Sequence, residues 1–213
     1  MWQRLLDFLF PRLSLTGREG MHVTPEEERH LRSWPVVIEA AELRSRGVKS
    51  LDRIVAASTY ESSPLLRLAI HRFKYRRVPA LQRELGALLA AASALLTVTG
   101  DSVLCPVPLH WTRKFQRGFN QSALLAAIVA EECGWHLAHL LTRVRPTGHQ
   151  ARRSRAARLV AMKHAFACVM DNVPSHVVLV DDIATTGATL DACAKALKER
   201  GVKRVDALVV AVG

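Results

Sequence analysis

Two hydrophobic periods alternate along the chain and predict an alternation of helices and strands. Apolar residues at helical spacing predict helices over 62–76 and 81–96, a helix that Asn120 caps and Gly134 ends, and a last helix that ends at Gly201. Runs of β-favouring residues predict strands over 102–107, 135–142, 165–170, 177–180 and 205–212. Because strands that alternate with helices form mainly parallel sheets covered on both faces, we predict a doubly wound α/β fold.

The pattern before residue 52 differs from the rest. Apolar residues between positions 2 and 9 recur at helical spacing, which suits a helix that packs on the body of the protein, or one that lies on a membrane surface. Thr24 and Glu27 have the types and the spacing of a capping box, so a second short helix is expected to begin there. We therefore expect a small N-terminal helical appendage over residues 1–51 and a core domain over residues 52–213.

The segment 177–190 combines a buried strand with groups that can bind a sugar phosphate. Two carboxylates, Asp181 and Asp182, follow the four apolar residues 177–180. They stand at the carboxyl end of the predicted strand, where open α/β sheets bind their ligands. Adjacent carboxylates can each accept a charge-assisted hydrogen bond from one hydroxyl of a ribose cis-diol.

The loop after these carboxylates has the composition of a phosphate-binding turn. It offers backbone N–H groups and the hydroxyls of Thr185, Thr186 and Thr189. Gly187 permits a tight backbone, and the positive end of the following helix dipole attracts an anion. The predicted 5′-phosphate-binding residues are Ala184, Thr185, Thr186, Gly187, Ala188 and Thr189.

Two other interpretations of this segment compete with a sugar-phosphate site. A strand that ends in two acids also resembles the Mg²⁺-holding strand of P-loop ATPases, but the chain contains no Gly-Lys pair, which that class requires. In a purely structural interpretation, the two carboxylates cap a helix and Thr-Gly makes a turn. That interpretation does not explain why strand, acid pair, loop and helix occur together.

A second candidate site joins the strand at 102–107 to the helix that Asn120 caps. Prolines stiffen the start of this loop and three cations follow, so it could neutralise a pyrophosphate group. The charge pattern alone fits a solvated basic loop equally well. The predicted pyrophosphate-binding residues are Pro108, Leu109, Arg113, Lys114 and Arg117, with Lys74 as a further phosphate contact whose alternative is a surface lysine.

The charge of the chain favours an anionic partner without naming it. Thirty Lys and Arg against nineteen Asp and Glu give a formal charge of +11 and a pI of about 10.3. Phosphates, nucleic acid, a membrane surface and a merely solubilising surface all fit this balance. The segment 143–158 is rich in arginine and fits a loop that closes over an anionic substrate, a track for a nucleic-acid backbone, or a solvated helix face.

Composition also excludes several classes of protein. With 49% apolar residues the chain can form a core, so it is not disordered as a whole. The longest apolar run, 85–98, is shorter than the roughly 20 residues that span a bilayer, and Arg4 and Asp7 interrupt any secretory signal. Four cysteines without a Cys-x-x-Cys pair indicate buried thiols in a reducing cytosol. The nine histidines, which form no ligand pair, are expected on the surface or in loops.

Four ordered motifs resemble the ComF family of type I phosphoribosyltransferase-like proteins. The segment 177–190 is similar to the signature that binds phosphoribosyl pyrophosphate (PRPP). The segments 106–110, Pro-Val-Pro-Leu-His, and 117–121, Arg-Gly-Phe-Asn-Gln, resemble the ComF group specifically. Two further motifs, over 60–75 and 150–166, extend the resemblance to about 160 residues.

The chain departs from this family in two places. ComF proteins typically carry a Cys-x-x-Cys-Gly zinc site after a Phe-Pro pair, but here Phe10-Pro11 is followed by 13–17, Leu-Ser-Leu-Thr-Gly. Since the first hundred residues contain no cysteine, we expect no zinc. The family's usual Asn falls on Ala161 and a usual Leu on Arg153, so the role of that Asn is not carried over.

The resemblance implies a function and its cofactor. Asp181 and Asp182 would be the catalytic carboxylates that hold the ribose hydroxyls of PRPP, and residues 184–189 would hold its 5′-phosphate. Mg²⁺ would arrive with PRPP, with Asp181 and Asp182 as its candidate protein ligands. ComF membership implies a cytoplasmic protein that acts in DNA uptake on internalised single strands, with a competence helicase-like ATPase as a candidate partner.

Two hypotheses follow from these motifs. The ComF motifs favour a PRPP site that serves DNA uptake, as a transferase, a sensor or a vestige. The alternative is a free-standing phosphoribosyltransferase of nucleotide salvage, which transfers the phosphoribosyl group of PRPP to a nitrogen nucleophile. A salvage enzyme needs a base-recognition loop, and we identify none in this sequence.

Overall fold

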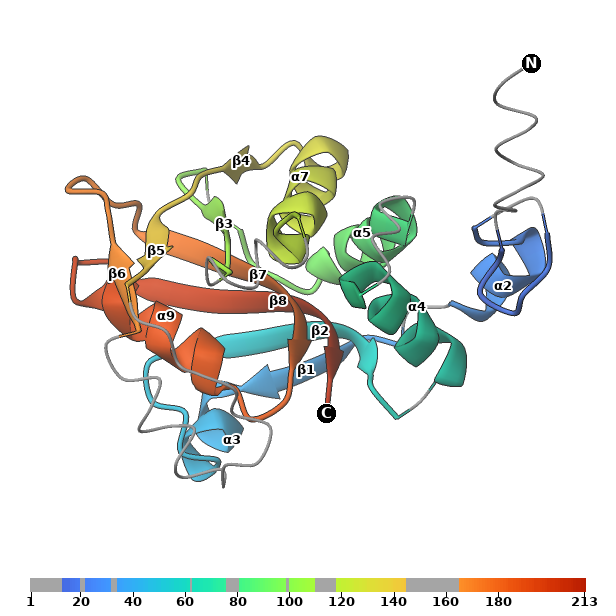
Figure 1. Ribbon diagram of the computed structural model, residues 1–213. Coiled ribbons are helices and arrows are strands. Elements are labelled where there is room, and N and C mark those ends of the chain that lie inside the picture. The colour runs from blue at the N-terminus through green and yellow to red at the C-terminus, as the bar shows by residue number, and fades with distance from the viewer. Residues whose placement is uncertain are drawn as a thin grey trace, which may run out of the picture.

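The centre of the molecule is a six-stranded sheet in the order β1-β2-β8-β7-β3-β4 (Figure 1). The computed structural model describes residues 13–19, 22–31, 34–61, 63–75, 81–98, 100–109, 118–144 and 165–213. The strands of the sheet are β1 (Val36–Glu39), β2 (Arg53–Thr59), β3 (Val103–Pro106), β4 (His136–Leu137), β7 (His176–Ala184) and β8 (Arg204–Val212). Strand β1 is antiparallel to β2 and the other neighbouring pairs are parallel, so the predicted mainly parallel α/β fold is confirmed.

Helices cover both faces of this sheet (Figure 1). One hydrophobic core contains Val178 and Val180 of β7 and residues of three helices, α4 (Pro64–Tyr75), α5 (Leu81–Ser93) and α7 (Gln121–Cys133). The other core contains Val177 and Leu179 and residues of α3 (Ala40–Ser45), α9 (Ala188–Lys198) and the antiparallel pair β5 (Leu141–Arg143) and β6 (Phe166–Cys168). Successive residues of β7 therefore enter opposite cores, as the two-residue period of a strand requires.

The predicted helices are confirmed where the structure describes them, although α5 ends at Ser93, three residues early, and α9 ends at Lys198, before Gly201. In α7 the Asn120 side chain accepts a hydrogen bond from the Ser122 N–H, and Gly134 ends the helix with φ of 68°. The capping box starts helix α2 (Pro25–His30), in which the Thr24 side chain accepts from the Glu27 N–H. The apolar stretch predicted as a helix over residues 2–9 lies outside the described residues.

The strands of the structure differ from the predicted ones in three ways. Strands β1 and β2 were not predicted, and β7 continues past 177–180 because Ile183 and Ala184 still pair with β8. The predicted strand 135–142 is two short strands, β4 and β5, because the chain leaves the sheet at Ala138 and then pairs with β6. Strands β1, β4 and β5 have only two to four residues, too few for a local period to detect. Strand β2 has seven residues with a continuous apolar run at 54–57, so its pattern was present in the sequence and was overlooked.

The sheet begins earlier in the chain than the predicted core domain. Strand β1 and helix α3 precede residue 52, yet β1 pairs with β2 over four residues and Leu43 of α3 is buried in the core shared with α9. The alternation along β1 is short, with Ile38 as its buried residue.

Among the described helices, none has the length and apolar character needed to span a bilayer.

A buried carboxylate organises the residues around α2. Glu27 is 4% exposed, and its Oε1 accepts hydrogen bonds from the Ser14 hydroxyl at 2.9 Å and the Thr16 N–H. Its Oε2 accepts from the Thr24 N–H at 2.8 Å. Burial raises the pKa of Glu27, but these hydrogen bonds outweigh burial and lower the pKa to about 2. The carboxylate is therefore ionised near neutral pH and joins the segment 14–16 to the start of α2.

The connections of β3 and β7 run in opposite directions across the sheet. Strand β3 connects through α7 to β4 on one side, whereas β7 connects through α9 to β8 on the other. The two strands are neighbours, so the topological switch point lies between them. In open α/β sheets the carboxyl ends of the strands at this point form the crevice that binds ligands. We therefore expect a functional site at the carboxyl ends of β3 and β7.

At the opposite, amino edge of the sheet a buried polar network joins three strand starts. His176 of β7 contacts the Ser102 hydroxyl through Nδ1 at 2.8 Å and Asp206 of β8 through Nε2 at 3.2 Å. Arg204 donates to the same Asp206 oxygen at 3.0 Å. The expectation that histidines lie on the surface or in loops is wrong for His176, which is 4% exposed.

Candidate functional site

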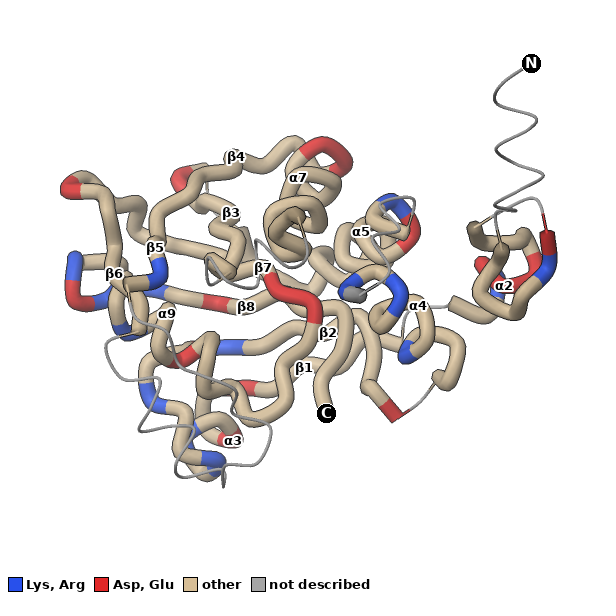
Figure 2. The backbone as a smooth tube through the Cα atoms, in the orientation of Figure 1, with Lys and Arg blue, Asp and Glu red and all other residues tan. Residues whose placement is uncertain are grey.

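The predicted acid pair lies at the topological switch point, near the carboxyl end of β7. Asp181 is paired opposite Val209 of β8, and the strand continues two residues beyond Asp182. Figure 2 shows this acidic segment of β7 beside basic positions on α4. The carboxylates therefore belong to the strand itself, and not to the loop that follows it, so the ladder with β8 fixes their backbone.

Asp182 forms an ion pair with a lysine of α4, one of the helices that cover the sheet. The Nζ of Lys74, in the last turn of α4, lies 2.8 Å from Asp182 Oδ1. Their side chains are 17% and 10% exposed respectively, so the pair is largely shielded from water. Lys74 was predicted as a phosphate contact, and the structure brings its ammonium to the acid pair.

Asp181 is held by the first turn of α7. Its Oδ1 accepts hydrogen bonds from the Ser122 hydroxyl at 2.8 Å and from the Asp182 N–H at 2.9 Å. Burial and the neighbouring charge of Asp182 raise the pKa of Asp181 to about 7, against the smaller opposing effects of Ser122 and Lys74. A carboxyl that changes its charge near neutral pH is typical of functional sites.

The predicted phosphate loop is the turn between β7 and α9. Ala184 ends β7, Thr185 to Gly187 form the turn, and Ala188 and Thr189 open the helix. Gly187 has φ of 73° and is buried, and the Thr186 hydroxyl accepts from the Ala188 N–H at 3.4 Å. The turn thus joins a strand end to a helix N-terminus, the arrangement that binds phosphate in α/β folds.

A further carboxylate, in α9, fixes the start of this helix to the segment 48–50. Asp191, in the first turn of α9, accepts from the backbone N–H groups of Lys49 and Ser50 through its Oδ1, at 2.8 and 2.5 Å. A Cβ on Gly187 would lie 2.9 Å from Cγ2 of Val48, in the same segment. The segment 48–50 therefore supports the predicted phosphate loop, a role that the sequence did not indicate.

Replacing Gly187 by alanine is expected to destabilise the protein and to deform the phosphate loop. Alanine costs about 1–2 kcal/mol in a left-handed conformation, and the contact with Val48 adds to this cost. Gly134→Ala is the matched control, because Gly134 has φ of 68° with nothing within 4 Å of its added Cβ. Thermal unfolding should show a larger loss of Tm for Gly187→Ala than for Gly134→Ala; equal losses would contradict the close contact.

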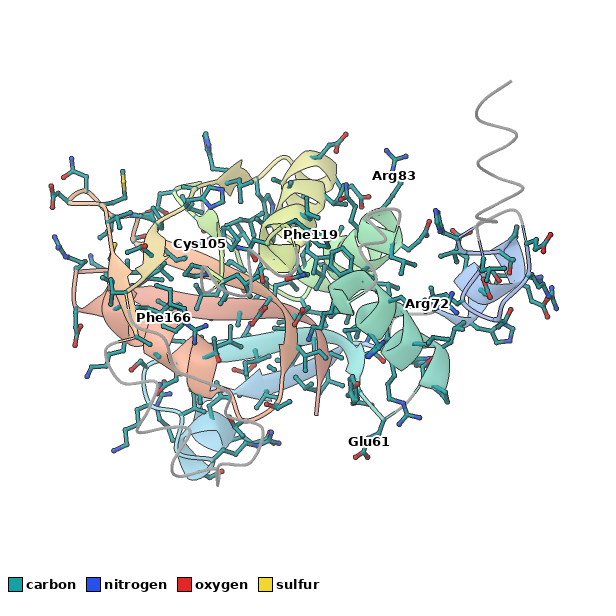
Figure 3. All side chains as sticks on the ribbon, in the orientation of Figure 1. Glu61, Arg72, Arg83, Cys105, Phe119 and Phe166 are labelled. Atoms are coloured by element: carbon teal, nitrogen blue, oxygen red, sulfur yellow. The ribbon has the colours of Figure 1, made fainter. Side chains whose placement is uncertain are left out.

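The loop predicted to bind pyrophosphate is anchored at both ends beside the acid pair. Val107, after β3, donates to the Val180 carbonyl at 3.0 Å, and its own carbonyl accepts from the Asn120 side chain at 3.1 Å. Phe119, labelled in Figure 3, packs on Phe73 of α4 with ring centroids 5.8 Å apart. Pro108 and Leu109 lie at the start of this loop, and Arg113, Lys114 and Arg117 lie outside the described residues.

Ser122 is the contact that sequence reasoning missed at the acid pair. It stands two residues after a recognised helix cap, where a serine has an ordinary structural explanation, and its partner is distant in sequence. No local signal could have identified it. The pairing of Lys74 with Asp182 was likewise hidden, since it depends on how α4 crosses the end of β7.

The donor set at this site suits a hard cation that a ligand delivers. Across the described residues, no three or more His, Cys, Asp and Glu side chains gather as a metal cluster. Mg²⁺ is commonly bound through one or two carboxylates together with the phosphates of a substrate. Asp181 and Asp182 fit that mode.

Comparisons with known proteins show which family the chain is similar to. A phosphoribosyl transferase domain model matches residues 173–212, which contain β7, the phosphate loop, α9 and β8. DNA utilization protein YhgH of Salmonella typhimurium is 34% identical over 160 residues, covering 72% of this chain and 69% of that protein. Competence protein F of Haemophilus influenzae is 31% identical over 167 residues, covering 73% and 71%.

Among solved structures, the B. subtilis glutamine PRPP amidotransferase complexed with ADP and GMP has a TM-score of 0.40 and 23% identity. That match covers 61% of this chain and 26% of the amidotransferase. The matches to the sequence relatives each cover more than two thirds of both chains. The chain therefore belongs to the ComF family of competence and DNA utilization proteins.

Proposed function

We propose that this protein binds PRPP with Mg²⁺ at the crevice between β3 and β7 and uses this site in the handling of internalised DNA. The observation that carries the proposal is the convergence of an acid pair, a phosphate-type turn and a helix N-terminus at the topological switch point. Each part matches one portion of PRPP. The acid pair suits the ribose diol, and the turn suits the 5′-phosphate.

In this proposal the residues of the chain position the sugar and its leaving group. Asp181 and Asp182 accept hydrogen bonds from the two ribose hydroxyls, while backbone N–H groups at the start of α9 hold the 5′-phosphate. Pro108 and Leu109, at the start of the loop after β3, would contact the pyrophosphate. Arg113, Lys114 and Arg117 lie outside the described residues, and we propose from their charge that they neutralise it. Asp181 and Asp182 would hold Mg²⁺ that arrives with PRPP, and the metal would supply charge neutralisation on the phosphates.

Transfer would break the bond from C1′ of the ribose to pyrophosphate and form a bond to a nitrogen nucleophile. Positive charge develops on the sugar ring in such a step, and the carboxylates of Asp181 and Asp182 would stabilise it. Whether this step takes place or PRPP acts as a signal depends on the acceptor. The proposal therefore separates PRPP binding, which the site supports directly, from turnover.

The role in DNA handling rests on the named relatives and on charge. One relative is a DNA utilization protein and another a competence protein, and the chain carries a formal charge of +11. Neutralising phosphates with Lys and Arg gives nucleic-acid affinity that falls steeply with salt. We propose single-stranded DNA as the macromolecular partner, a cytoplasmic location, and an interaction with a helicase-like ATPase.

Isothermal titration of the full chain with PRPP, with and without Mg²⁺, tests the binding site. We expect saturable binding at one site that strengthens when Mg²⁺ is present; absence of binding under both conditions would overturn the proposal. Pyrophosphate release with a panel of bases and amines then tests turnover. Release with a free base would favour nucleotide salvage instead.

Titration with a single-stranded oligonucleotide across a salt series tests the partner. We expect affinity that falls linearly on a logarithmic plot as salt increases. A chain without affinity even at low salt would remove single-stranded DNA from the proposal while leaving the PRPP site intact.

A further inference from the structure

The acid pair holds an internal cation of its own. Lys74 Nζ lies 2.8 Å from Asp182 Oδ1, and both side chains are largely buried. Lys74 stands in the last turn of α4, where the negative end of the helix dipole also favours a cation. The ammonium is therefore a fixed part of the site and not a mobile surface charge.

An ammonium in this position opposes the binding of a free divalent cation. It occupies one oxygen of Asp182, and it repels a second cation at the same carboxylate. The other carboxylate, Asp181, already accepts two hydrogen bonds at its Oδ1, from Ser122 and from the Asp182 N–H. Mg²⁺ gives up its hydration water reluctantly, so a site with few available oxygens does not hold it alone.

A metal that arrives with a polyphosphate ligand meets different conditions. The phosphates supply further oxygens and negative charge, which balance both the metal and the Lys74 ammonium. The ammonium then becomes an additional attraction for the ligand's phosphates. The same residue thus weakens binding of the metal alone and favours binding of the metal with its ligand.

We propose that Lys74 makes this site selective for a divalent cation that arrives with a phosphosugar. Its ammonium excludes free divalent cations from Asp182, so the acid pair binds only the metal–phosphosugar complex. This inference rests on the proposed PRPP function for the identity of the complex. The exclusion of free metal rests only on the ion pair with Asp182.

The test uses Mn²⁺ alone as the probe, with no PRPP present. Electron paramagnetic resonance of free Mn²⁺ measures its binding to the wild type, Lys74→Met and Lys74→Arg. We expect Lys74→Met to bind one Mn²⁺ at least tenfold more tightly than the wild type. Lys74→Arg keeps the positive charge and should bind Mn²⁺ as weakly as the wild type.

Two further variants locate the effect. Lys195→Met removes an exposed lysine that pairs with Glu199 on the surface of α9, and it should leave Mn²⁺ binding unchanged. Lys74→Met combined with Asp182→Asn removes the released carboxylate and should return binding to the wild-type level. Equal Mn²⁺ affinity in Lys74→Met and the wild type would overturn the proposal.

Folding and the proposed function are controlled separately. Lys74→Gln keeps a hydrogen-bond donor for Asp182 while removing the charge, so it replaces Lys74→Met if the latter does not fold by circular dichroism. Failure of the wild type to bind PRPP, together with tighter Mn²⁺ binding in Lys74→Met, would refute the ligand and retain the exclusion. PRPP binding with no change in Mn²⁺ affinity would refute the exclusion alone.

Discussion

Replacing Asp181 and Asp182 together by asparagine is expected to lower the affinity for PRPP by at least about 100-fold. A hydrogen bond to a charged group contributes roughly 1.5–3 kcal/mol, and about 1.4 kcal/mol corresponds to a tenfold change in Kd. Losing the charge at two such acceptors therefore removes at least two decades of affinity. Isothermal titration in the presence of Mg²⁺ measures the effect directly.

The control for this double variant is Asp171→Asn. Asp171 is an exposed carboxylate that pairs with Arg200 at 3.1 Å, away from the crevice between β3 and β7. The Asp171→Asn variant should bind PRPP with the same affinity as the wild type. If the double variant also binds PRPP with unchanged affinity, the acid pair is not the ribose site and the proposed function loses its main support.

Replacing Asp181 alone by asparagine should raise the stability of the protein at pH 8 while it lowers the affinity for PRPP. The pKa of Asp181 is raised from 3.8 to about 7, by burial first and by Asp182 second. A carboxyl with a raised folded pKa contributes stability below its unfolded pKa and loses that contribution as the pH rises through 7. Asp181→Asn avoids the cost of the buried charge, so at pH 8 it should have a higher Tm than the wild type.

The same ionisation should appear in ligand binding. PRPP affinity of the wild type should rise between pH 6 and pH 8, as Asp181 becomes a charged acceptor, and this rise should be smaller in Asp181→Asn. A residue that lowers stability while it supports binding is characteristic of a functional site. A site with a purely structural role would lose stability on substitution, so an Asp181→Asn variant with lower Tm and unchanged affinity contradicts this assignment.

The parts of the site that could be predicted from the sequence are those that are contiguous in it. Asp181, Asp182 and the turn around Gly187 lie within nine consecutive residues, 181–189, so residue type and order were sufficient. The supporting contacts come from elsewhere in the chain. Lys74 and Ser122 reach the acid pair only because α4 and α7 pack over the carboxyl end of β7, and no local pattern encodes that crossing.

The fold, like the site, has elements that a local sequence pattern predicts and elements that depend on tertiary contacts. Helices α4, α5, α7 and α9 carry amphipathic or capped patterns of eleven or more residues, which a local period detects reliably. Strand β1 has four residues and a single buried side chain, Ile38, and its existence depends on β2 as a partner. Short edge strands are determined by tertiary pairing, so they were missed.

The largest expected loss of stability comes from the amino edge of the sheet, at Asp206. This carboxylate is fully buried and accepts hydrogen bonds from Arg204 and from His176, which also contacts Ser102. Removing one partner of a buried, charged network costs about 3–5 kcal/mol, because the remaining groups lose their acceptor. For a protein of this size each kcal/mol lowers Tm by about 2–4 °C, so Asp206→Ala should melt about 6–20 °C below the wild type.

The pH dependence of stability distinguishes this network from ordinary packing. Burial alone would raise the pKa of Asp206, but the hydrogen bonds and charges of His176 and Arg204 outweigh it and hold the pKa below 3.8. A lowered folded pKa contributes stability above the unfolded value, and that contribution disappears as the pH falls below about 4. The Tm difference between the wild type and Asp206→Ala should therefore narrow in acid.

The control is Asp171→Asn, at an exposed carboxylate. It should change Tm little at any pH, since surface ion pairs contribute about 0–1 kcal/mol. A constant difference from pH 7 to pH 3 would show that Asp206 acts through its volume and not its charge.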